Sequence, residues 1–215
     1  MNDPQPEPLL VARKLTYERD GLPVFEAVDL ELCSGGVVEL LGPNGSGKTT
    51  LLRCLAGLNI DYCGELQCST AVAYVAHRSG LNPALSAVEN LAWYAALSTP
   101  DSDLETKQAG TANSPDDALR ESLSRVGVDH VADAPCGQLS AGQQRRVMLA
   151  RLLVDPALLW LLDEPLTALD QAGRGLVEEL IDGHRGAGGA VVCATHQRLD
   201  RDDTQTLELT PGALV

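Results

Sequence analysis

The feature that most constrains the fold is a glycine-rich octapeptide, Gly42-Pro43-Asn44-Gly45-Ser46-Gly47-Lys48-Thr49. It fits the pattern G-x-x-x-x-G-K-[ST] without a mismatch. A short apolar segment at 37–41 precedes it, and this segment reads as a buried strand. After it, apolar residues recur at helical spacing (Leu51, Leu52, Leu55 and Leu58), with Gly57 near the expected helix end. The sequence therefore predicts a strand, a tight loop and a helix in direct succession.

Such a loop suits a triphosphate, which is a dense anion. Backbone N–H groups can converge on it because glycine tolerates the dihedral angles required, and the following helix adds its positive N-terminal end. Lys48 supplies a point charge for the β- and γ-phosphates, and the Thr49 hydroxyl is placed to ligate Mg²⁺. The alternative is a glycine-rich turn with a chance lysine, which the flanking strand and helix disfavour.

A second apolar strand, expected at 158–162, is followed by two acidic residues, Asp163 and Glu164. A buried strand delivers such side chains to the carboxyl edge of a sheet, where open α/β folds bind ligands. Asp163 is expected to orient Mg²⁺, and Glu164 is expected to act as the general base that polarises the attacking water. The alternative is an ordinary pair of strand-end acids that caps the next helix.

Strands and helices alternate along the rest of the chain. Expected strands lie within 9–32 and at 72–75 and 190–194, and expected helices follow Ser86 and Ser114 and span 140–154 and 171–184. Alternation of this kind favours an α/β fold with a mainly parallel sheet. We expect residues 1–8 to form a loose tail and residues 9–215 to form one domain. Within this domain, we expect the polar residues 98–118 to form an exposed loop.

Composition excludes some classes of partner. The chain has 16 Lys plus Arg and 30 Asp plus Glu, a formal net charge of −14, which argues against nucleic acid and anionic lipid as direct ligands. No apolar run approaches the ~20 residues that span a bilayer, and the N-terminus lacks a secretory pattern, so a cytosolic location is expected. The six cysteines form no C-x-x-C pair, and reduced structural thiols are expected rather than zinc ligands or disulfides.

The motifs in chain order resemble ATP-binding cassette ATPases. The series is GPNGSGKTT at 42–50, LSAGQ at 139–143, LLDEP at 161–165, TALD at 167–170 and Thr195-His196. The resemblance covers about residues 9–210. It implies a P-loop NTPase core with a parallel sheet, a small antiparallel β subdomain and an inserted helical subdomain at about 79–138.

The resemblance also implies roles for single residues. ATP would be held by Gly42, Pro43, Asn44, Gly45, Ser46, Gly47, Lys48, Thr49 and Thr50, with adenine stacked on Tyr17. Ser140, Ala141, Gly142 and Gln143 would contact the γ-phosphate of a second copy's ATP, so a homodimer enclosing two nucleotides is implied. His196 would hydrogen-bond the γ-phosphate beside Glu164. The alternatives are a plain helix N-cap for Ser140, a satisfied core histidine for His196 and an edge-strand aromatic for Tyr17.

One position departs from the family pattern. These ATPases place a glutamine after the strand at 72–75, where it senses Mg²⁺ and touches the membrane partner, and here His77 holds that position. A neutral imidazole can accept a hydrogen bond from water, but it titrates near physiological pH. A surface-loop histidine is the alternative.

That histidine, the Gln-Gln-Arg-Arg after LSAGQ and Thr195-His196-Gln197 resemble one branch, the bacterial haem exporter ATP-binding subunits of cytochrome c maturation. The branch implies haem export for c-type cytochromes and an integral membrane permease subunit that docks around residues 77–97. The chain would lie peripherally on the cytoplasmic side of the inner membrane. Three alternative hypotheses of function stay open. The chain could be a cassette ATPase for a lipid, drug or lipoprotein, a nucleotide switch without a role in transport, or an assembly subunit with little ATP turnover.

Overall fold

The computed structural model describes residues 7–98, 114–196 and 198–210, and the chain divides into two compact units. Unit 1 contains Met1–His77, Ala157–Leu166 and Val177–Val215, and unit 2 contains Arg78–Pro156 and Thr167–Leu176. Most of the expected N-terminal tail, most of the expected loop at 98–118, and Gln197 lie outside the described residues.

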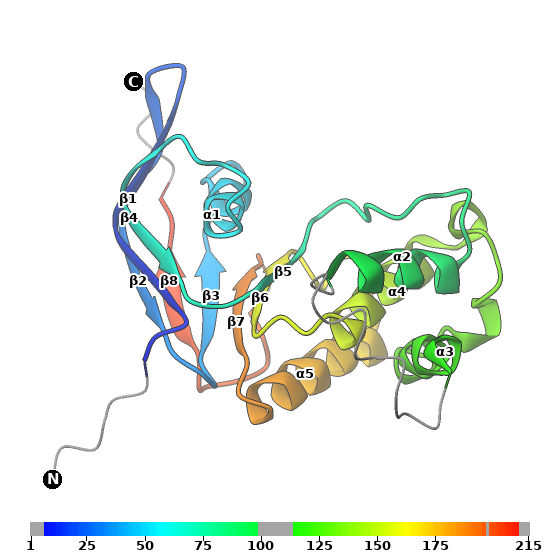
Figure 1. The fold of residues 1–215 in the computed structure, drawn as a ribbon. Coiled ribbons are helices and arrows are strands. Elements are labelled where there is room, and N and C mark those ends of the chain that lie inside the picture. Colours follow the sequence, from blue (N-terminus) through cyan, green and yellow to red (C-terminus); the bar gives the residue numbers. More distant parts are fainter. Residues whose placement is uncertain (1–6, 99–113, 197, 211–215) are drawn as a thin grey trace, which may run out of the picture. The chain divides into compact units, whose positions relative to one another are not determined.

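The described residues of unit 1 include a five-stranded parallel sheet in the order β5-β6-β7-β3-β8 (Figure 1). The strands are β3 (Val37–Leu41), β5 (Val72–Val75), β6 (Leu159–Asp163), β7 (Ala190–Ala194) and β8 (Gln205–Glu208). Every residue of β6 and β7 is buried, as their continuous apolar sequences predict for strands covered on both faces. Because the strands are parallel, the carboxyl ends of β3, β6 and β7 lie at one edge of the sheet.

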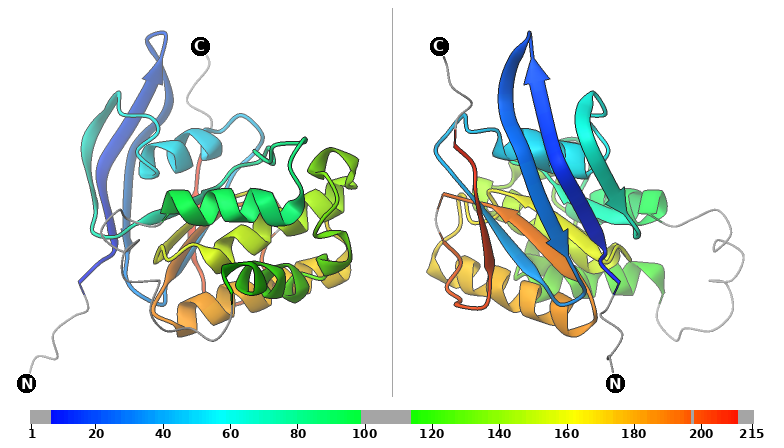
Figure 2. Two further views of the ribbon diagram at one scale, coloured as in Figure 1. Left: turned by 45° about the vertical axis from the view of Figure 1, so that its right-hand side comes forward. Right: turned by 90° about the vertical axis from the view of Figure 1, so that its left-hand side faces the viewer.

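A second, antiparallel sheet belongs to the same unit. Its described strands are β1 (Leu10–Arg19), β2 (Leu22–Leu32) and β4 (Tyr62–Cys68), in the order β2-β1-β4. The right-hand view of Figure 2 shows the three strands side by side. Helix α1 (Lys48–Leu55) contacts β4 of this sheet and β6 and β7 of the parallel sheet. The core cluster joins residues of both sheets and α1, and Phe25 is the one aromatic ring among its described buried members.

Leu58 is not part of α1, so that detail of the sequence prediction is wrong. The helix ends at Leu55, and Gly57 adopts a left-handed φ of 70°. The N–H of Leu58 then donates to the carbonyl of Arg53 at 2.8 Å, which is the long hydrogen bond of a Schellman helix end. The Leu58 side chain is 57% exposed.

Unit 2 is helical in its described part. It contains α2 (Ala87–Ser98), α3 (Pro115–Arg125), the 3-10 helices η2 (Asp129–Val131) and η3 (Cys136–Gln138), and α4 (Ala141–Val154). The expected caps are confirmed: the Ser86 and Ser114 hydroxyls accept from the N–H groups of Glu89 and Asp117, each at 3.2 Å. Helices α2, α3 and α4 contact one another around buried residues such as Leu91, Leu123 and Leu149.

The cysteines are free thiols. Cys54, Cys136 and Cys193 are buried, whereas Cys63 and Cys68 are exposed on β4. Burial raises the pKa of the Cys54 thiol to about 11, so this side chain behaves as a small apolar group at neutral pH. Within the described ranges, no helix has both the length and the apolar character needed to cross a bilayer.

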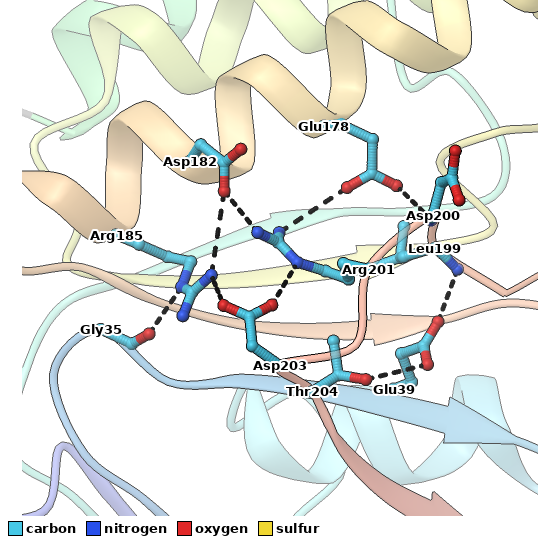
Figure 3. Close-up of polar contacts among 10 residues, drawn as sticks. All are labelled: Gly35, Glu39, Glu178, Asp182, Arg185, Leu199, Asp200, Arg201, Asp203 and Thr204. Atoms are coloured by element: carbon cyan, nitrogen blue, oxygen red, sulfur yellow. Dashed lines mark hydrogen bonds and ion pairs between the residues drawn. The ribbon is translucent and has the colours of Figure 1, made fainter.

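Helix α5 (Gln171–Gly186) is followed in unit 1 by β7 and then by a segment that carries an ion-pair cluster. Asp203 accepts from Arg185 at 2.7 Å and from Arg201 at 2.9 Å, and Arg201 also reaches Glu178 and Asp182 (Figure 3). These two hydrogen bonds lower the pKa of Asp203 from 3.8 to about 2, and the hydrogen bond from Arg185 has the larger effect. The cluster connects the chain after β7 to the last turns of α5.

The lowered pKa of Asp203 predicts an acid-dependent contribution to stability. Because the folded-state value lies below the unfolded value, the contribution is complete above pH about 4 and disappears as the pH falls toward 2. We expect Asp203→Asn to lower the melting temperature at pH 7 and to have no effect near pH 2, measured by thermal unfolding across this range. Asp202→Asn, at the neighbouring exposed carboxylate, is the control; an Asp203→Asn effect that does not change with pH would contradict the prediction.

Candidate nucleotide site

The glycine-rich loop connects β3 to α1, as the sequence predicts, and two of its glycines are required by geometry. Gly42 has a φ of 148°, and a Cβ there would lie 2.4 Å from the carbonyl oxygen of Leu209. Gly47 has a φ of 95° and directly precedes α1, with Val24 and Phe25 closely packed against it. A side chain at either position would alter the path of the loop.

Lys48, the first residue of α1, directs its ammonium group back toward this loop. The Lys48 Nζ donates to the carbonyl oxygens of Gly42 at 2.6 Å and Pro43 at 3.0 Å, and the residue is only 7% exposed. Among the described residues, the buried Ser46 hydroxyl has no hydrogen-bond partner. A cation, a helix N-terminus and an unpaired hydroxyl therefore share one loop, a donor set that fits a polyphosphate.

Asp163, at the end of β6, lies beside Thr49. The Thr49 hydroxyl donates to Asp163 Oδ2 at 2.9 Å, and Asp163 is 1% exposed. The Tyr74 hydroxyl lies 3.5 Å from the same oxygen. Burial, together with the negative charge of Asp163, raises the pKa of Tyr74 to about 12, so this phenol is protonated at neutral pH. A hydroxyl and a carboxylate are hard oxygen ligands, the type that Mg²⁺ prefers.

The next residue, Glu164, pairs with His196. Its Oε2 lies 2.7 Å from His196 Nδ1, and its N–H donates to the carbonyl of Ala194 at 2.8 Å. The backbone of Glu164 has a φ of 52°, which is unusual for a non-glycine residue. The Glu164 side chain is 14% exposed and that of His196 is 54% exposed. A carboxylate can only accept, so Nδ1 carries the hydrogen of this contact.

The carboxyl edge of the parallel sheet in unit 1 carries the glycine-rich loop and the five side chains just described: Thr49, Tyr74, Asp163, Glu164 and His196. β3 leads to the loop, β6 to Asp163 and Glu164, and β7 to Thr195 and His196. The sequence predicted each of these side chains except Tyr74 separately, and the parallel order of the strands brings them together. Tyr74 was not predicted as part of this site, and its position one residue before the end of strand 72–75 was the available signal.

The LSAGQ segment begins α4 in unit 2. Ser140 is the N-cap: its hydroxyl accepts from the N–H of Gln143 at 3.2 Å, and Gln143 Oε1 accepts from the Ser140 N–H at 2.9 Å. The N-cap interpretation is therefore correct for Ser140 and does not conflict with a role in binding. Ser140 and Ala141 are exposed, and Asp170 of the TALD segment lies 3.4 Å from Arg146 on the same helix.

Tyr17 and His77 are also placed in unit 1. Tyr17 is half-buried on β1, with its ring stacked near that of Phe25 at a centroid distance of 6.2 Å. Among the described strands β1 is the middle one of its sheet, so the edge-strand interpretation of Tyr17 is wrong. His77 is exposed and lies two residues after the end of β5, at the last position of the first segment of unit 1.

The fold and the loop define a P-loop nucleotide-binding protein. The sequence matches the family described as ABC transporter over residues 25–167. The chain therefore belongs to the ABC transporter family, as an ATP-binding and ATP-hydrolysing subunit.

The chain is also similar to individual proteins over most of its length. The chain is 42% identical over 206 residues to the cytochrome c biogenesis ATP-binding export protein CcmA of Pseudomonas fluorescens, covering 90% of this chain and 92% of the relative. It is 37% identical over 216 residues to CcmA of Vibrio cholerae, covering 95% and 99%. A solved bacterial ABC transporter cassette, described as a dimer, shares the fold with a TM-score of 0.81 at 24% identity, covering 93% of this chain and 94% of that one.

The geometry of the glycine-rich loop predicts that Lys48 is needed to hold nucleotide. Lys48→Ala removes the cation beside the loop, so we expect ATP to bind at least about tenfold more weakly, as loss of a charge-assisted contact implies. Titration with a fluorescent ATP analogue measures this. Arg13→Ala, which removes the same charge from an exposed ion pair with Glu31, is the control. Equal affinities of Lys48→Ala and wild type would refute this role.

Proposed function

We propose that this chain powers haem export, or a related step in haem handling, for the biogenesis of c-type cytochromes. It would act with an integral membrane permease subunit, peripherally on the cytoplasmic side of a bacterial inner membrane. The observation that carries this proposal is the 42% identity to a cytochrome c biogenesis ATP-binding export protein, which extends over 90% of this chain and 92% of that protein.

ATP is assigned to the carboxyl edge of the parallel sheet. The loop from Gly42 to Thr50 would hold the phosphates through its backbone N–H groups and Lys48, whose present contacts to two loop carbonyls a phosphate would replace. Tyr17 would stack on adenine, since its ring is half-buried and held beside Phe25. An aromatic face that is partly exposed and partly packed suits a planar base.

Hydrolysis is assigned to Glu164 and His196. Glu164 would take a proton from the attacking water as the water oxygen bonds to the γ-phosphorus and the bond to the β,γ-bridging oxygen breaks, giving ADP and phosphate. The contact from His196 Nδ1 to Glu164 Oε2 would orient the carboxylate that acts as the base. His196 would also hydrogen-bond the γ-phosphate. Catalysis of this type is mainly positioning and electrostatics.

Magnesium fits the oxygen pair of Thr49 and Asp163, which lie 2.9 Å apart. The ion would neutralise charge on the β- and γ-phosphates when it is bound. Asp163 is buried, and the Tyr74 hydroxyl constrains the carboxylate oxygen that contacts Thr49. His77 is assigned a further role near the metal, because it holds the position where the resembling ATPases carry a glutamine that senses Mg²⁺.

The signature residues Ser140, Ala141, Gly142 and Gln143 are assigned to the nucleotide of a second copy, so that two chains enclose two ATP molecules. Ser140 and Ala141 are exposed at the N-terminus of α4, where backbone N–H groups and the helix dipole favour an anion. The permease would dock around residues 77–97. Trp93 and Leu97 of α2 expose 55% and 64% of their surfaces, which suits an apolar partner. No nucleic acid is expected as a partner.

Gene deletion with complementation tests this function. We expect the deletion strain to lose c-type cytochromes, and wild-type protein to restore them. Glu164→Gln should fail to restore them, because the amide cannot accept the proton, although the variant accumulates and binds ATP in purified form. Haem-stained gels and a nucleotide-binding assay provide the two measurements. Normal c-type cytochromes in the deletion strain would contradict the assignment of cargo, and restoration by Glu164→Gln would contradict the role of Glu164.

A further inference from the structure

Glu39 is a buried carboxylate with no part in the roles assigned above. It occupies the middle of β3 and is 1% exposed, among apolar neighbours such as Val38 and Leu40. Burying a charged group costs free energy unless hydrogen bonds compensate for the lost water. The groups that donate hydrogen bonds to Glu39 therefore explain how a carboxylate can be buried inside a parallel sheet.

Both donors come from the chain that follows His196. Glu39 Oε1 accepts from the N–H of Leu199 at 2.6 Å, and Oε2 accepts from the hydroxyl of Thr204 at 3.2 Å. Figure 3 shows the carboxylate with these contacts to both ends of the segment from Leu199 to Thr204. We refer to residues 199–204 as the strap. Each oxygen of Glu39 thus holds one end of the strap.

The same strand also holds the chain on the other side of His196. The N–H of Thr195 donates to the carbonyl of Leu40 at 3.3 Å. Consecutive residues of β3 therefore fix the backbone immediately before His196 and three residues after it. Since β3 continues directly into the glycine-rich loop, one strand sets the positions of both the phosphate loop and the histidine.

The outer side of the strap is attached to α5. Asp200 donates its N–H to Glu178 Oε1 at 2.9 Å, and Arg201, with its side chain 9% exposed, pairs with Glu178, Asp182 and Asp203. The carboxylate partners of Arg201 are more exposed than Glu39: the side chains of Asp182 and Asp203 are 62% and 58% exposed. Glu39 is the most deeply buried attachment, and its loss leaves the N–H of the buried Leu199 without its acceptor.

We propose that Glu39 is a positioning residue that fixes the strap and thereby holds His196 against Glu164. This inference rests on the proposed function for the catalytic roles of His196 and Glu164, but the position of His196 can be measured without reference to activity. The isosteric Glu39→Gln keeps an oxygen acceptor for Leu199 and a polar atom for Thr204, so it should preserve the strap. Glu39→Leu fills similar space and removes both acceptors.

Histidine ring ¹⁵N NMR of the full-length chain provides the direct test. The protein has four histidines, so comparison with His196→Gln assigns the His196 signals. We expect Glu39→Leu to shift the His196 ring signals and Glu39→Gln to leave them near their wild-type positions. Val38→Ala, which weakens packing at the adjacent position of β3, controls for a general loss of stability and should not shift them. Unshifted His196 signals in folded Glu39→Leu protein would overturn the proposal.

Steady-state ATP hydrolysis gives the second readout. We expect Glu39→Leu to lower kcat at least about tenfold with KM for ATP within about twofold of wild type, since misplacing a catalytic group affects the chemical step more than binding. Shifted His196 signals with unchanged kcat would support the positioning role and contradict the catalytic role of His196. If Glu39→Leu does not fold, Thr204→Val replaces it. Removal of this one donor should still shift the His196 signals, and its failure to do so would overturn the proposal.

Discussion

Parallel hydrogen bonding among β3, β6 and β7 is the interaction on which the nucleotide site depends. Each strand is short and leads directly to one part of the site. Strand β3 ends just before the glycine-rich loop, β6 ends at the first residue of the Asp163–Glu164 pair, and β7 ends just before Thr195–His196. The register that pairs Leu162 with Cys193 and Asp163 with Ala194 places the acidic pair beside the histidine. The hydrogen bond from Glu164 to the carbonyl of Ala194 continues that register beyond the sheet and holds the unusual backbone of Glu164.

Local sequence chemistry predicted a large part of the fold and of the site. The glycine pattern requires dihedral angles that other residues avoid, and both Gly42 and Gly47 have positive φ. Continuous apolar runs identified β6 and β7, and serine residues at the expected spacing identified the helix starts at Ser86 and Ser114. In each case a few neighbouring residues carry the whole signal, so no knowledge of distant contacts was needed.

Other features depend on contacts between distant segments, which the sequence alone does not show. Strands β4 and β8 were missed because their sequences, YCGELQC and QTLE, contain no continuous apolar run, and their side chains are all exposed or half-buried. Tyr74 was missed because its partner Asp163 lies 89 residues further along the chain, and the donors to Glu39 lie 160 and 165 residues away. A charged residue inside an apolar strand was nevertheless visible in the sequence, and it marked a buried attachment.

The most direct test of this account is whether two chains close around the nucleotide. Sedimentation equilibrium of Glu164→Gln, with ATP and Mg²⁺ present and then removed, measures this because blocked hydrolysis prevents the dimer from reopening. We predict a dimer with one ATP bound per chain when nucleotide is present, and a monomer after its removal. A protein that binds ATP but stays monomeric with ATP and Mg²⁺ present would show that the exposed start of α4 does not complete the site of a second copy, and would contradict this conclusion.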